Sequence, residues 1–530
     1  MKRRIVSILA CFMLLACSAK PPVRKSVDEL KTLLAQSNAA VFKEEVNAVY
    51  EIFPIAFADS DNNNIGDLQG IIHQLDYLND GDDTTTADLG INAIWLTPIY
   101  PSPSYHKYDV TDYKNIDPKF GTLDDFKELI AEADKRGIKI ILDMVFNHSS
   151  YDHPWFQKAL ANEKPYTDYY RFETEVPKEQ YANRSSWYKA KDRFYYASFW
   201  DRMPEFNVEN EAVREEFKSI LSFWLDLGVS GFRYDAAKHV YDQYEYPSGF
   251  PLLESNLQFW LEMKQHVKTV NPDAFVVAEV WLPTTAMAPY IPAFDSLLDF
   301  DFGTSVIQAV NAGSKQSVVN SYVKNMAVKA ERNSQYINGT FLTNHDQERV
   351  MSSLGSDVAK AKLAASILLT MPGTPFIYYG EELGMQGKKP DEQIREPMKW
   401  SNSFDGVVPY WESWKYNNDT PSAEVQTEDP ASMLSTYRNL LAVRKQHPAL
   451  RSDEIEEVNL KNSSLMAYLR KDLTETLFVV HNMYQGDMEF SYPVGELVYA
   501  SGDVAVGDAL DGTSKLVLAG RTTAIFKVGE

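Results

Sequence analysis

The chain has 530 residues, which is too long for a single ordinary domain and long enough for a large barrel with smaller modules. Hydrophobic residues make up 44% of it and aromatic residues 13%, a composition that excludes a disordered chain. The 52 basic and 74 acidic residues give a formal net charge of −22, and a field of this sign repels phosphate backbones. We therefore expect no nucleic-acid partner, whereas a neutral polymer is indifferent to this charge.

Residues 1–17 are typical of an export signal. Met1–Arg4 is a basic start, and Ile5–Leu15 is an almost wholly apolar run that is shorter than the about 20 residues needed to span a membrane. Leu14–Cys17 resembles the bacterial lipoprotein signal, in which the cysteine is acylated and becomes the mature N-terminus. This pattern predicts lipid attachment at Cys17; an ordinary cleaved signal peptide is the alternative.

The exported protein is then expected to be held at a bacterial membrane, on the periplasmic or cell-surface side, through its lipid anchor only. The other cysteine, Cys11, lies within the signal, so processing at Cys17 leaves no pair for an intramolecular disulfide. Residues 18–45 contain two adjacent prolines and a modest helical pattern, and we interpret them as a tether.

Residues 46–448 contain short apolar runs, each followed by a helical pattern. The runs are Val49–Phe53, Asn92–Leu96, Ile138–Val145, Gly231–Asp235, Ala274–Glu279, Ser296–Asp301, Gly339–Thr343 and Pro375–Tyr379. Strands that alternate with helices form parallel βα units, and eight such units close into a barrel. The sequence therefore predicts the α/β class and a (β/α)8 TIM barrel.

Two further domains are predicted from breaks in this pattern. More than 80 residues separate the third run from the fourth, far more than a normal βα loop, and the segment is rich in aromatic residues. We interpret residues 149–205 as an inserted domain B, which divides the barrel into residues 46–148 and 206–448. Residues 449–530 change to short alternating strands and predict a C-terminal antiparallel β-sandwich. Its clearest strands are Leu465–Arg470, Thr476–His481, Met488–Tyr492 and Thr522–Val528.

Three carboxylates fall at or just after the carboxyl ends of predicted barrel strands, where barrel enzymes carry their catalytic groups. Asp235 ends the fourth strand, Glu279 ends the fifth, and Asp346 follows the seventh. Two carboxyls on neighbouring strands suit glycoside hydrolysis. Four apolar residues precede Glu279 and favour its protonated form, whereas Arg233, two residues before Asp235, favours an ionised carboxylate there. Any one of these acids alone is as consistent with a helix N-cap.

Several segments resemble the α-amylase family. Four correspond in order to its signature segments: Asp143–His148, Gly231–His239, Ala278–Trp281 and Phe341–Asp346. Three more match its pattern: Tyr105–Tyr113, Met203–Asn207 and Gly373–Glu382. The resemblance runs from about Tyr50 to the C-terminus and implies hydrolysis of α-glucans with retention of the α configuration.

The resemblance also implies a role for individual residues. It makes Asp235 the nucleophile, Glu279 the acid/base and Asp346 the group that fixes the 2- and 3-hydroxyls of the sugar. It implies a sugar-stacking Tyr108 and a Lys238–His239 pair that binds sugars beyond the cut. The residues that it assigns to hydrogen bonds with the sugar are His148, Arg233 and His345. The sequence departs from the family at Lys107, where many relatives have glycine.

An acidic loop predicts a calcium site. Side chains with oxygen atoms stand at its positions 1, 3, 5 and 9, a spacing that suits a hard cation. These residues are Asp59, Asp61, Asn63 and Asp67. A solvated acidic turn is the alternative. The resemblance adds the backbone carbonyl of Ile65 as a ligand, and it implies a possible second calcium held by Asn147 and the carbonyl of His239.

These observations predict a monomeric, retaining, endo-acting hydrolase of α-1,4-glucosidic bonds in starch, glycogen or maltooligosaccharides. An α-glucosidase or oligo-1,6-glucosidase acting on short α-glucans is the first alternative, suggested by the calcium loop and by Arg395–Trp400. A non-catalytic glucan-binding lipoprotein is an alternative of a different class, although binding alone does not require all three carboxylates.

Overall fold

The computed structural model describes residues 25–34, 40–82, 84–176, 185–404, 406–510 and 512–528. The predicted signal and Cys17 lie outside these residues. No helix among the described residues is long and apolar enough to cross a membrane.

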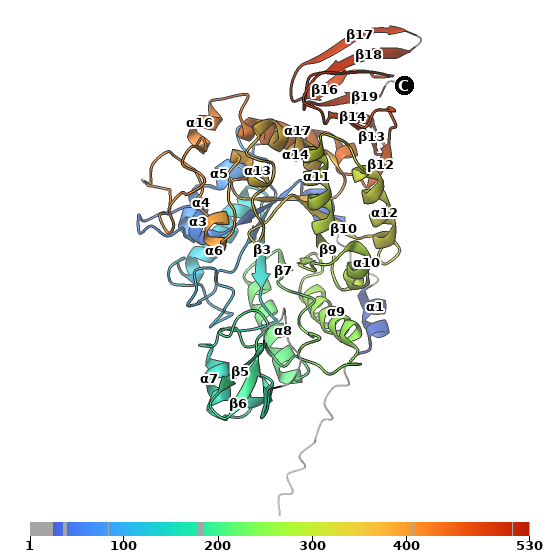
Figure 1. The fold of residues 1–530 in the computed structure, drawn as a ribbon. Helices are drawn as coiled ribbons and strands as arrows, with labels where there is room; N and C mark the ends of the chain where they lie inside the picture. Colours follow the sequence, from blue (N-terminus) through green and yellow to red (C-terminus); the bar gives the residue numbers. More distant parts are fainter. Residues whose placement is uncertain are drawn as a thin grey trace, which may run out of the picture.

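The centre of the molecule is a closed barrel of parallel strands (Figure 1). Its strands are β1 (Val49–Ile52), β2 (Ala93–Leu96), β3 (Lys139–Met144), β7 (Gly231–Tyr234), β8 (Phe275–Ala278), β9 (Ser296–Asp299), β10 (Ile337–Phe341) and β11 (Thr374–Tyr378). Each strand pairs with its neighbours in chain order, and β11 closes the circle against β1. Almost every residue of these strands is buried, which is why they read as continuous apolar runs. The predicted (β/α)8 barrel is confirmed.

Helices surround the barrel. The longer ones are α4 (Leu68–His73), α6 (Leu123–Lys135), α8 (Glu211–Asp226), α9 (Leu252–Val270), α11 (Phe300–Ala312), α12 (Val318–Ala330), α14 (Val358–Thr370) and α17 (Met433–Gln446). Short helical turns are α3 (Pro54–Phe57), α5 (Leu75–Leu78), α10 (Thr284–Met287), η2 (Ala288–Ala293), α13 (Val350–Ser353), η3 (Glu381–Leu383), α15 (Asp391–Ile394), α16 (Ala423–Thr427) and η4 (Pro448–Leu450). Helix α6 shows the local logic: Thr122 and Asp125 form a capping box at its start, and Phe126, Leu129 and Ala133 form its buried face.

The segment predicted as a tether contains two helices that pack on the barrel. They are α1 (Val27–Leu34), which lies against α9, and α2 (Ala40–Glu45). Leu30 of α1 is buried, and the ring of Phe42 in α2 stacks on Phe275 at the start of β8, with 3.7 Å between centroids. The tether prediction is therefore wrong for α1 and α2, because Leu30, Leu34 and Phe42 are buried in the folded body.

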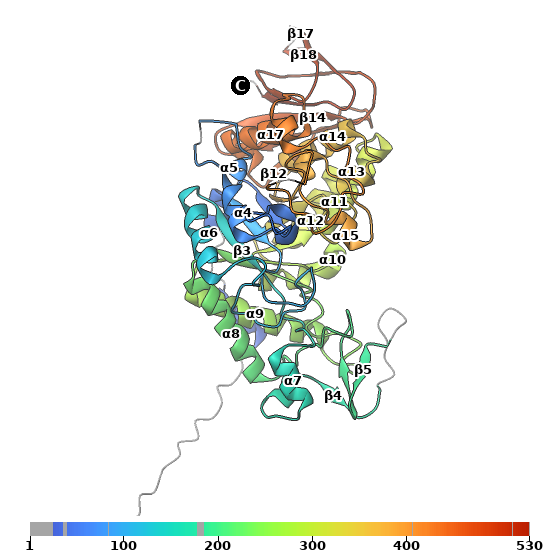
Figure 2. The ribbon, with the colours of Figure 1, turned by 90° about the vertical axis from the view of Figure 1, so that its left-hand side faces the viewer.

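The insertion after β3 forms a small separate lobe. It contains α7 (Pro154–Leu160), η1 (Tyr166–Asp168) and a three-stranded antiparallel sheet of β4 (Phe172–Glu173), β6 (Arg193–Tyr196) and β5 (Trp187–Ala190). Figure 2 shows this lobe projecting from the body next to α8 and α9. Phe156 packs against Tyr170 and Tyr195, so much of the aromatic content fills the core of this lobe.

The C-terminal domain is a sandwich of two antiparallel sheets. One contains β12 (Glu454–Glu457), β13 (Leu465–Lys471), β14 (Thr476–Asn482), β19 (Thr523–Lys527) and β16 (Leu497–Ala500); the other contains β15 (Met488–Tyr492), β18 (Thr513–Leu518) and β17 (Val504–Leu510). Buried residues of both sheets, such as Phe478 and Leu516, form a common apolar core. The sandwich packs on α14 and α17, at the opposite end of the molecule from the inserted lobe (Figure 1). The predicted sandwich is confirmed.

Candidate active site

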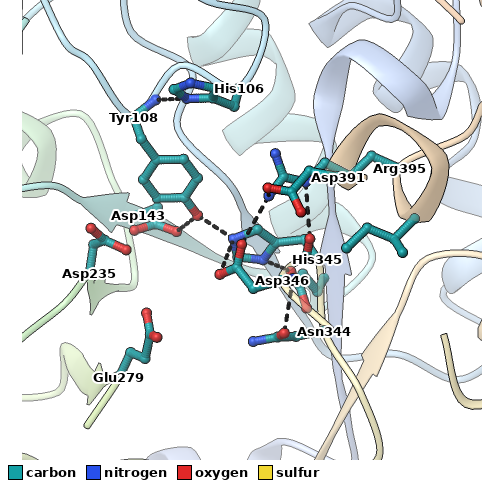
Figure 3. A network of polar contacts seen from close by, with 12 residues as sticks. His106, Tyr108, Asp143, Asp235, Glu279, Asn344, His345, Asp346, Asp391 and Arg395 are labelled. Carbon is teal, nitrogen blue, oxygen red and sulfur yellow. Dashed lines mark hydrogen bonds and ion pairs between the residues drawn. The ribbon is translucent and has the colours of Figure 1, made fainter. Parts of the chain in front are cut away.

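A cavity of about 650 Å³ lies at the carboxyl ends of the barrel strands and is also bordered by the inserted lobe. Its lining includes Tyr108, His148, Asp235, Lys238, His239, Glu279 and Asp346. The same cavity is lined by His106, Phe199, Trp200, Met203, Ala236, Trp281, Lys389, Asp391 and Arg395. The structure thus brings the three predicted catalytic carboxylates to one place. Figure 3 shows these carboxylates with the polar network around them.

The barrel positions the first two carboxylates through adjacent strands. Asp235 directly follows β7 and Glu279 directly follows β8, and these strands pair in parallel. Just beyond the strands, the backbone N–H of Ala237 donates to the carbonyl of Glu279 at 3.1 Å. Ala236, which lies between Asp235 and Ala237 in the chain, has φ of 47°, a left-handed conformation that is uncommon for a residue with a side chain. The two strand ends are therefore tied together beside the nucleophile candidate.

Arg233 connects three carboxylates. Its side chain is fully buried, and one guanidinium nitrogen donates to Asp143 Oδ1 at 2.9 Å and to Asp235 Oδ1 at 2.8 Å. Its second terminal nitrogen donates to Glu279. A single guanidinium thus compensates for much of the charge that the cavity floor buries.

Asp143 organises the floor of the cavity, a role that the sequence reasoning did not assign to it. Besides Arg233, it accepts hydrogen bonds from Trp95 Nε1 at 3.1 Å and from Tyr108 Oη at 3.0 Å. Tyr108 also contacts His345 Nε2 at 2.8 Å, and its ring lies nearly parallel to that imidazole. The only sequence signal for Asp143 was its place at the start of a signature segment, near the end of a strand.

His345 and Arg395 hold Asp346 from two sides. The Nε2 atom of His345 lies 3.1 Å from one carboxylate oxygen of Asp346, and Arg395 donates to the other at 2.9 Å. The Nδ1 atom of His345 faces the buried carboxylate of Glu51, which comes from β1. Glu51 and Arg395 were not predicted as site residues, although the segment that contains Arg395 had been singled out.

The three cavity carboxyls have different proton affinities. Burial raises the pKa of Asp235 to about 6, against the lowering effect of Arg233. Burial also raises the pKa of Glu279, where Arg233 again opposes it and the charge of Asp235 adds to it. Burial acts in the same direction on Asp346, but His345 and Arg395 outweigh it and hold that pKa below its usual value.

The remaining predicted binding residues also reach the cavity. Burial lowers the pKa of His148 to about 3, so its ring is neutral, and its Nε2 atom has no hydrogen-bond partner. The His239 ring contacts Asp242 through Nδ1 at 2.6 Å. Lys238 Nζ donates to the backbone carbonyl of Trp281 at 3.2 Å, so Lys238 is placed by a carbonyl and not by a carboxylate.

The structure explains the departure from the family pattern at Lys107. This residue has φ of 65°, in the left-handed region that glycine adopts without strain. Its side chain is buried, and Nζ contacts Asp117 at 2.7 Å and the carbonyl of Ser102 at 3.0 Å. These contacts compensate for the unusual backbone and keep the ammonium group out of the cavity lining.

The predicted calcium loop joins α3 to α4 and gathers its acidic side chains. Oxygen atoms of Asp59, Asp61 and Asp67 all lie within 4.8 Å of one another. Asp59 also accepts backbone N–H bonds within the loop, including one from Asn64 at 2.7 Å, and Asp67 caps α4. A set of converging carboxylate oxygens suits a hard cation. Asn63 Oδ1 accepts from the N–H of Ile65 at 2.8 Å, so it stabilises the turn.

A second group of oxygen atoms lies where the inserted lobe meets the barrel. Asn147 Oδ1 and Glu205 Oε2 are both buried without a hydrogen-bond partner, and residues 148 and 205 form a β-bridge. Burial raises the pKa of Glu205 to about 8, and the nearby Asp242 contributes to this. Glu205 is therefore the acidic side chain of the insertion that lies beside Asn147, which the sequence did not identify.

The fold and the site define a barrel enzyme with paired carboxyls of the kind that cleaves glycosidic bonds. The model of the family described as "Alpha amylase, catalytic domain" matches residues 51–453, so the chain belongs to the α-amylase family and is a glycosidase. "Alpha-amylase 3" of Dictyoglomus thermophilum is 39% identical over 487 residues, which cover 91% of this chain and 93% of that protein.

A "4-alpha-glucanotransferase" of Thermotoga neapolitana is 32% identical over 454 residues, which cover 83% of this chain and 96% of that protein. The crystal structure of an alpha-amylase from H. orenii superimposes with a TM-score of 0.85 at 38% identity. That match covers 91% of this chain and 99% of the other. The predicted family and enzyme class are confirmed.

Proposed function

We propose that the protein is a retaining, endo-acting hydrolase of α-1,4-glucosidic bonds in starch, glycogen or maltooligosaccharides. The proposal rests on one observation: Asp235 and Glu279 both accept hydrogen bonds from the guanidinium of Arg233. Two carboxyls that share a single guanidinium are close together, as in retaining glycosidases, where they are about 5–5.5 Å apart.

In this mechanism Asp235 attacks the anomeric carbon while Glu279 protonates the departing oxygen. A covalent glycosyl ester forms on Asp235, and Glu279 then takes a proton from the water that hydrolyses it. The pKa values of the two carboxyls support Asp235 as the nucleophile and Glu279 as the acid/base. Asp235, with a pKa of about 6, is mostly ionised at neutral pH, whereas the raised pKa of Glu279 favours the proton that a general acid needs.

The other residues bind the sugar that is attacked. Tyr108 offers its ring as a stacking surface, and Asp346, held by His345 and Arg395, accepts hydrogen bonds from two hydroxyls. His148 has an unpartnered nitrogen that can bond to the sugar. None of these groups changes its covalent bonds; they orient the ring so that its anomeric carbon faces Asp235.

The proposal of endo cleavage is supported by the wall beyond Glu279. Lys238, His239 and Trp281 line this side, and contacts there are useful only if the leaving group is itself a sugar chain. Product analysis on starch, maltotriose and isomaltose tests the proposal. We expect an early fall in starch viscosity with short maltooligosaccharides in the α configuration. Release of glucose alone, while viscosity hardly changes, contradicts endo cleavage.

An α-glucosidase or oligo-1,6-glucosidase is a second candidate. The observation that favours it is the group of charged side chains around Asp346, at the other end of the cavity from Trp281. Arg395 contacts Asp346 and approaches Asp391 at 3.5 Å, and Lys389 also pairs with Asp391. Charged side chains grouped at this end suit the recognition of a terminal sugar. Cleavage of isomaltose or maltose in preference to starch in the same assays supports this candidate.

We also propose that calcium binds the loop of residues 59–67, through Asp59, Asp61, Asp67 and the carbonyl of Ile65. The converging carboxylates support this, and the ion would stabilise the folded loop without taking part in the chemistry. Asn63 would contribute less, because its side-chain oxygen already accepts from the backbone. A second ion at Asn147, with the carbonyl of His239, is supported by the unpartnered oxygens of Asn147 and Glu205.

For its place in the cell, the proposal is an exported monomer that is anchored to a membrane through lipid on Cys17. It rests on the basic start, the apolar run and Leu14–Cys17 of the sequence. A single acyl chain gives only weak membrane binding, and stable anchoring takes two, so lipoprotein-type acylation accounts for a permanent attachment.

A further inference from the structure

A carboxyl group lies inside the barrel, below the residues that touch the sugar. Glu51 of β1 is only 2% exposed, and it is not among the residues that line the cavity. It shares a face of β1 with Val49, which belongs to the apolar cluster inside the barrel. A carboxylate buried in such surroundings costs free energy unless a cation or several donors compensate for it. One of its oxygens contacts Nδ1 of His345.

The other ring nitrogen of His345 faces two groups that can only accept a hydrogen bond. Tyr108 has one hydroxyl proton and donates it to Asp143 at 3.0 Å, so its oxygen accepts from His345 Nε2 at 2.8 Å (Figure 3). Asp346, whose pKa is lowered, is ionised at neutral pH and lies 3.1 Å from the same nitrogen. The Nε2 atom of His345 therefore carries a hydrogen.

The same reasoning applies at Nδ1. An ionised Glu51 has no proton to donate, so Nδ1 carries a hydrogen as well, and a ring with two N–H groups is a cation. Burial lowers the pKa of His345, and Arg395 acts in the same direction. Asp346 and Glu51 outweigh both, so this pKa lies above its usual value. The remaining charged or titratable groups that interact with the ring are Tyr108, Asp143 and Glu279.

We propose that Glu51 is a positioning residue that keeps the ring of His345 positively charged and thereby holds Asp346 as an ionised acceptor for sugar hydroxyls. The inference deepens the proposed function, because it rests on the role of Asp346 given there. Glu51 acts through His345 and does not touch the sugar. Without its charge, the ring would lose its proton at a lower pH, so the activity should become more sensitive to alkaline conditions.

Glu51→Gln tests this role at nearly constant volume. The amide can donate to Nδ1, so the ring of His345 keeps its place and its Nε2 hydrogen, but it is no longer held in the charged form. We expect kcat/KM on a soluble aryl maltoside to be near the wild-type value at about pH 5 and about tenfold lower at about pH 8, on either side of the usual pKa of histidine. Glu51→Asp keeps the negative charge and should show a smaller deficit at about pH 8.

A second measurement reports the charge of the ring without reference to activity. In protein labelled with ¹⁵N-histidine, the nitrogen chemical shifts distinguish a ring with two N–H groups from a ring with one. The signal of His345 is assigned by its absence from His345→Asn. We expect two protonated nitrogens in the wild type at neutral pH and one in Glu51→Gln.

Glu475→Gln is the matched control, because Glu475 also contacts a histidine Nδ1, that of His447, at 2.8 Å, but lies directly before β14 in the C-terminal sandwich. It should leave the pH dependence of kcat/KM unchanged. Thermal unfolding, measured in parallel, shows that each variant is folded.

Three results would overturn the inference while leaving hydrolysis intact. A deficit in folded Glu51→Gln that is equal at every pH is a structural effect. A deficit that shrinks as pH rises is the effect of a lost cation on Glu279, whose pKa the charge of His345 lowers. A wild-type ring with a single protonated nitrogen contradicts the charge itself. A wild-type enzyme that cleaves neither starch nor the maltoside overturns the proposed function, and with it the role of Asp346.

Discussion

Replacing Arg233 with methionine removes the guanidinium that contacts Asp143, Asp235 and Glu279 together. Methionine has a similar length and no charge, so the packing of the side chain changes little while the electrostatics change greatly. Arg233 lowers the pKa of both Asp235 and Glu279, against the effect of burial. Arg233→Met should therefore raise both pKa values.

The size of the effect follows from the starting pKa. With Asp235 at about 6, roughly nine-tenths of the nucleophile is ionised at pH 7. A contacting cation lowers the pKa of a carboxyl by about 1–3, so its loss should move Asp235 to about 8. Only roughly a tenth then remains ionised at pH 7, and kcat/KM falls about tenfold from this cause alone. Since the ionised form is lost as pH falls through the pKa, the acidic limb of the pH profile moves upward by about 2.

The assay is the pH dependence of kcat/KM on a soluble aryl maltoside, with thermal unfolding measured in parallel. Removing one partner from a buried ion pair costs about 3–5 kcal/mol, so some loss of stability is expected. Arg444→Met is the matched control, because Arg444 is also fully buried but donates to backbone carbonyls such as those of Leu369 and Gly373. It should lower stability without moving the acidic limb. An unmoved acidic limb in folded Arg233→Met refutes the electrostatic argument.

Three other predictions concern catalysis, metal and anchor. Asp235→Asn and Glu279→Gln should each lower kcat by about 10³-fold or more, and the double variant should lose little further, because the two act as a unit; near-normal activity in either single variant contradicts the assigned roles. Calcium should raise the melting temperature, because binding to the folded state adds about 2.7 kcal/mol to the free energy of unfolding when the ion is at 100 times Kd. This response should vanish in Asp61→Ala combined with Asp67→Ala. Wild-type protein should partition into detergent, and Cys17→Ser should release it to water; partitioning that survives the change excludes the anchor.

The barrel could be predicted from the sequence because its strands are buried on both sides. A fully buried parallel strand is a short apolar run, and each predicted run overlaps an observed strand. The C-terminal sheets were harder to predict. Strands β12 and β16 are mostly exposed or half-exposed, whereas β13 and β14 are runs of largely buried, mostly apolar residues and were easier to recognise.

The apolar runs of the barrel strands also predicted where the site residues lie, at the strand ends. They did not predict which of these residues contact one another. His345 contacts Glu51, which lies 294 positions earlier, and Tyr108 contacts His345 across 237 positions. No spacing rule relates such residues, because only closure of the barrel brings β1 beside the later strands. The packing of the helices before the barrel was missed although their helical pattern was visible, because α1 has only eight residues and its buried face depends on the neighbouring α9.

The three cavity carboxyls differ in how many positively charged side chains contact each of them. Asp346, which contacts both His345 and Arg395, has a lowered pKa and stays ionised as a hydroxyl acceptor. Asp235 and Glu279 share Arg233, and their pKa values are raised because burial outweighs that single cation. A nucleophile needs to be ionised yet weakly solvated, and an acid/base needs to exchange its proton near neutral pH. The distribution of His345, Arg395 and Arg233 among these three carboxyls meets both needs, and for this reason the variants of Arg233 test the mechanism more directly than removal of any one acid.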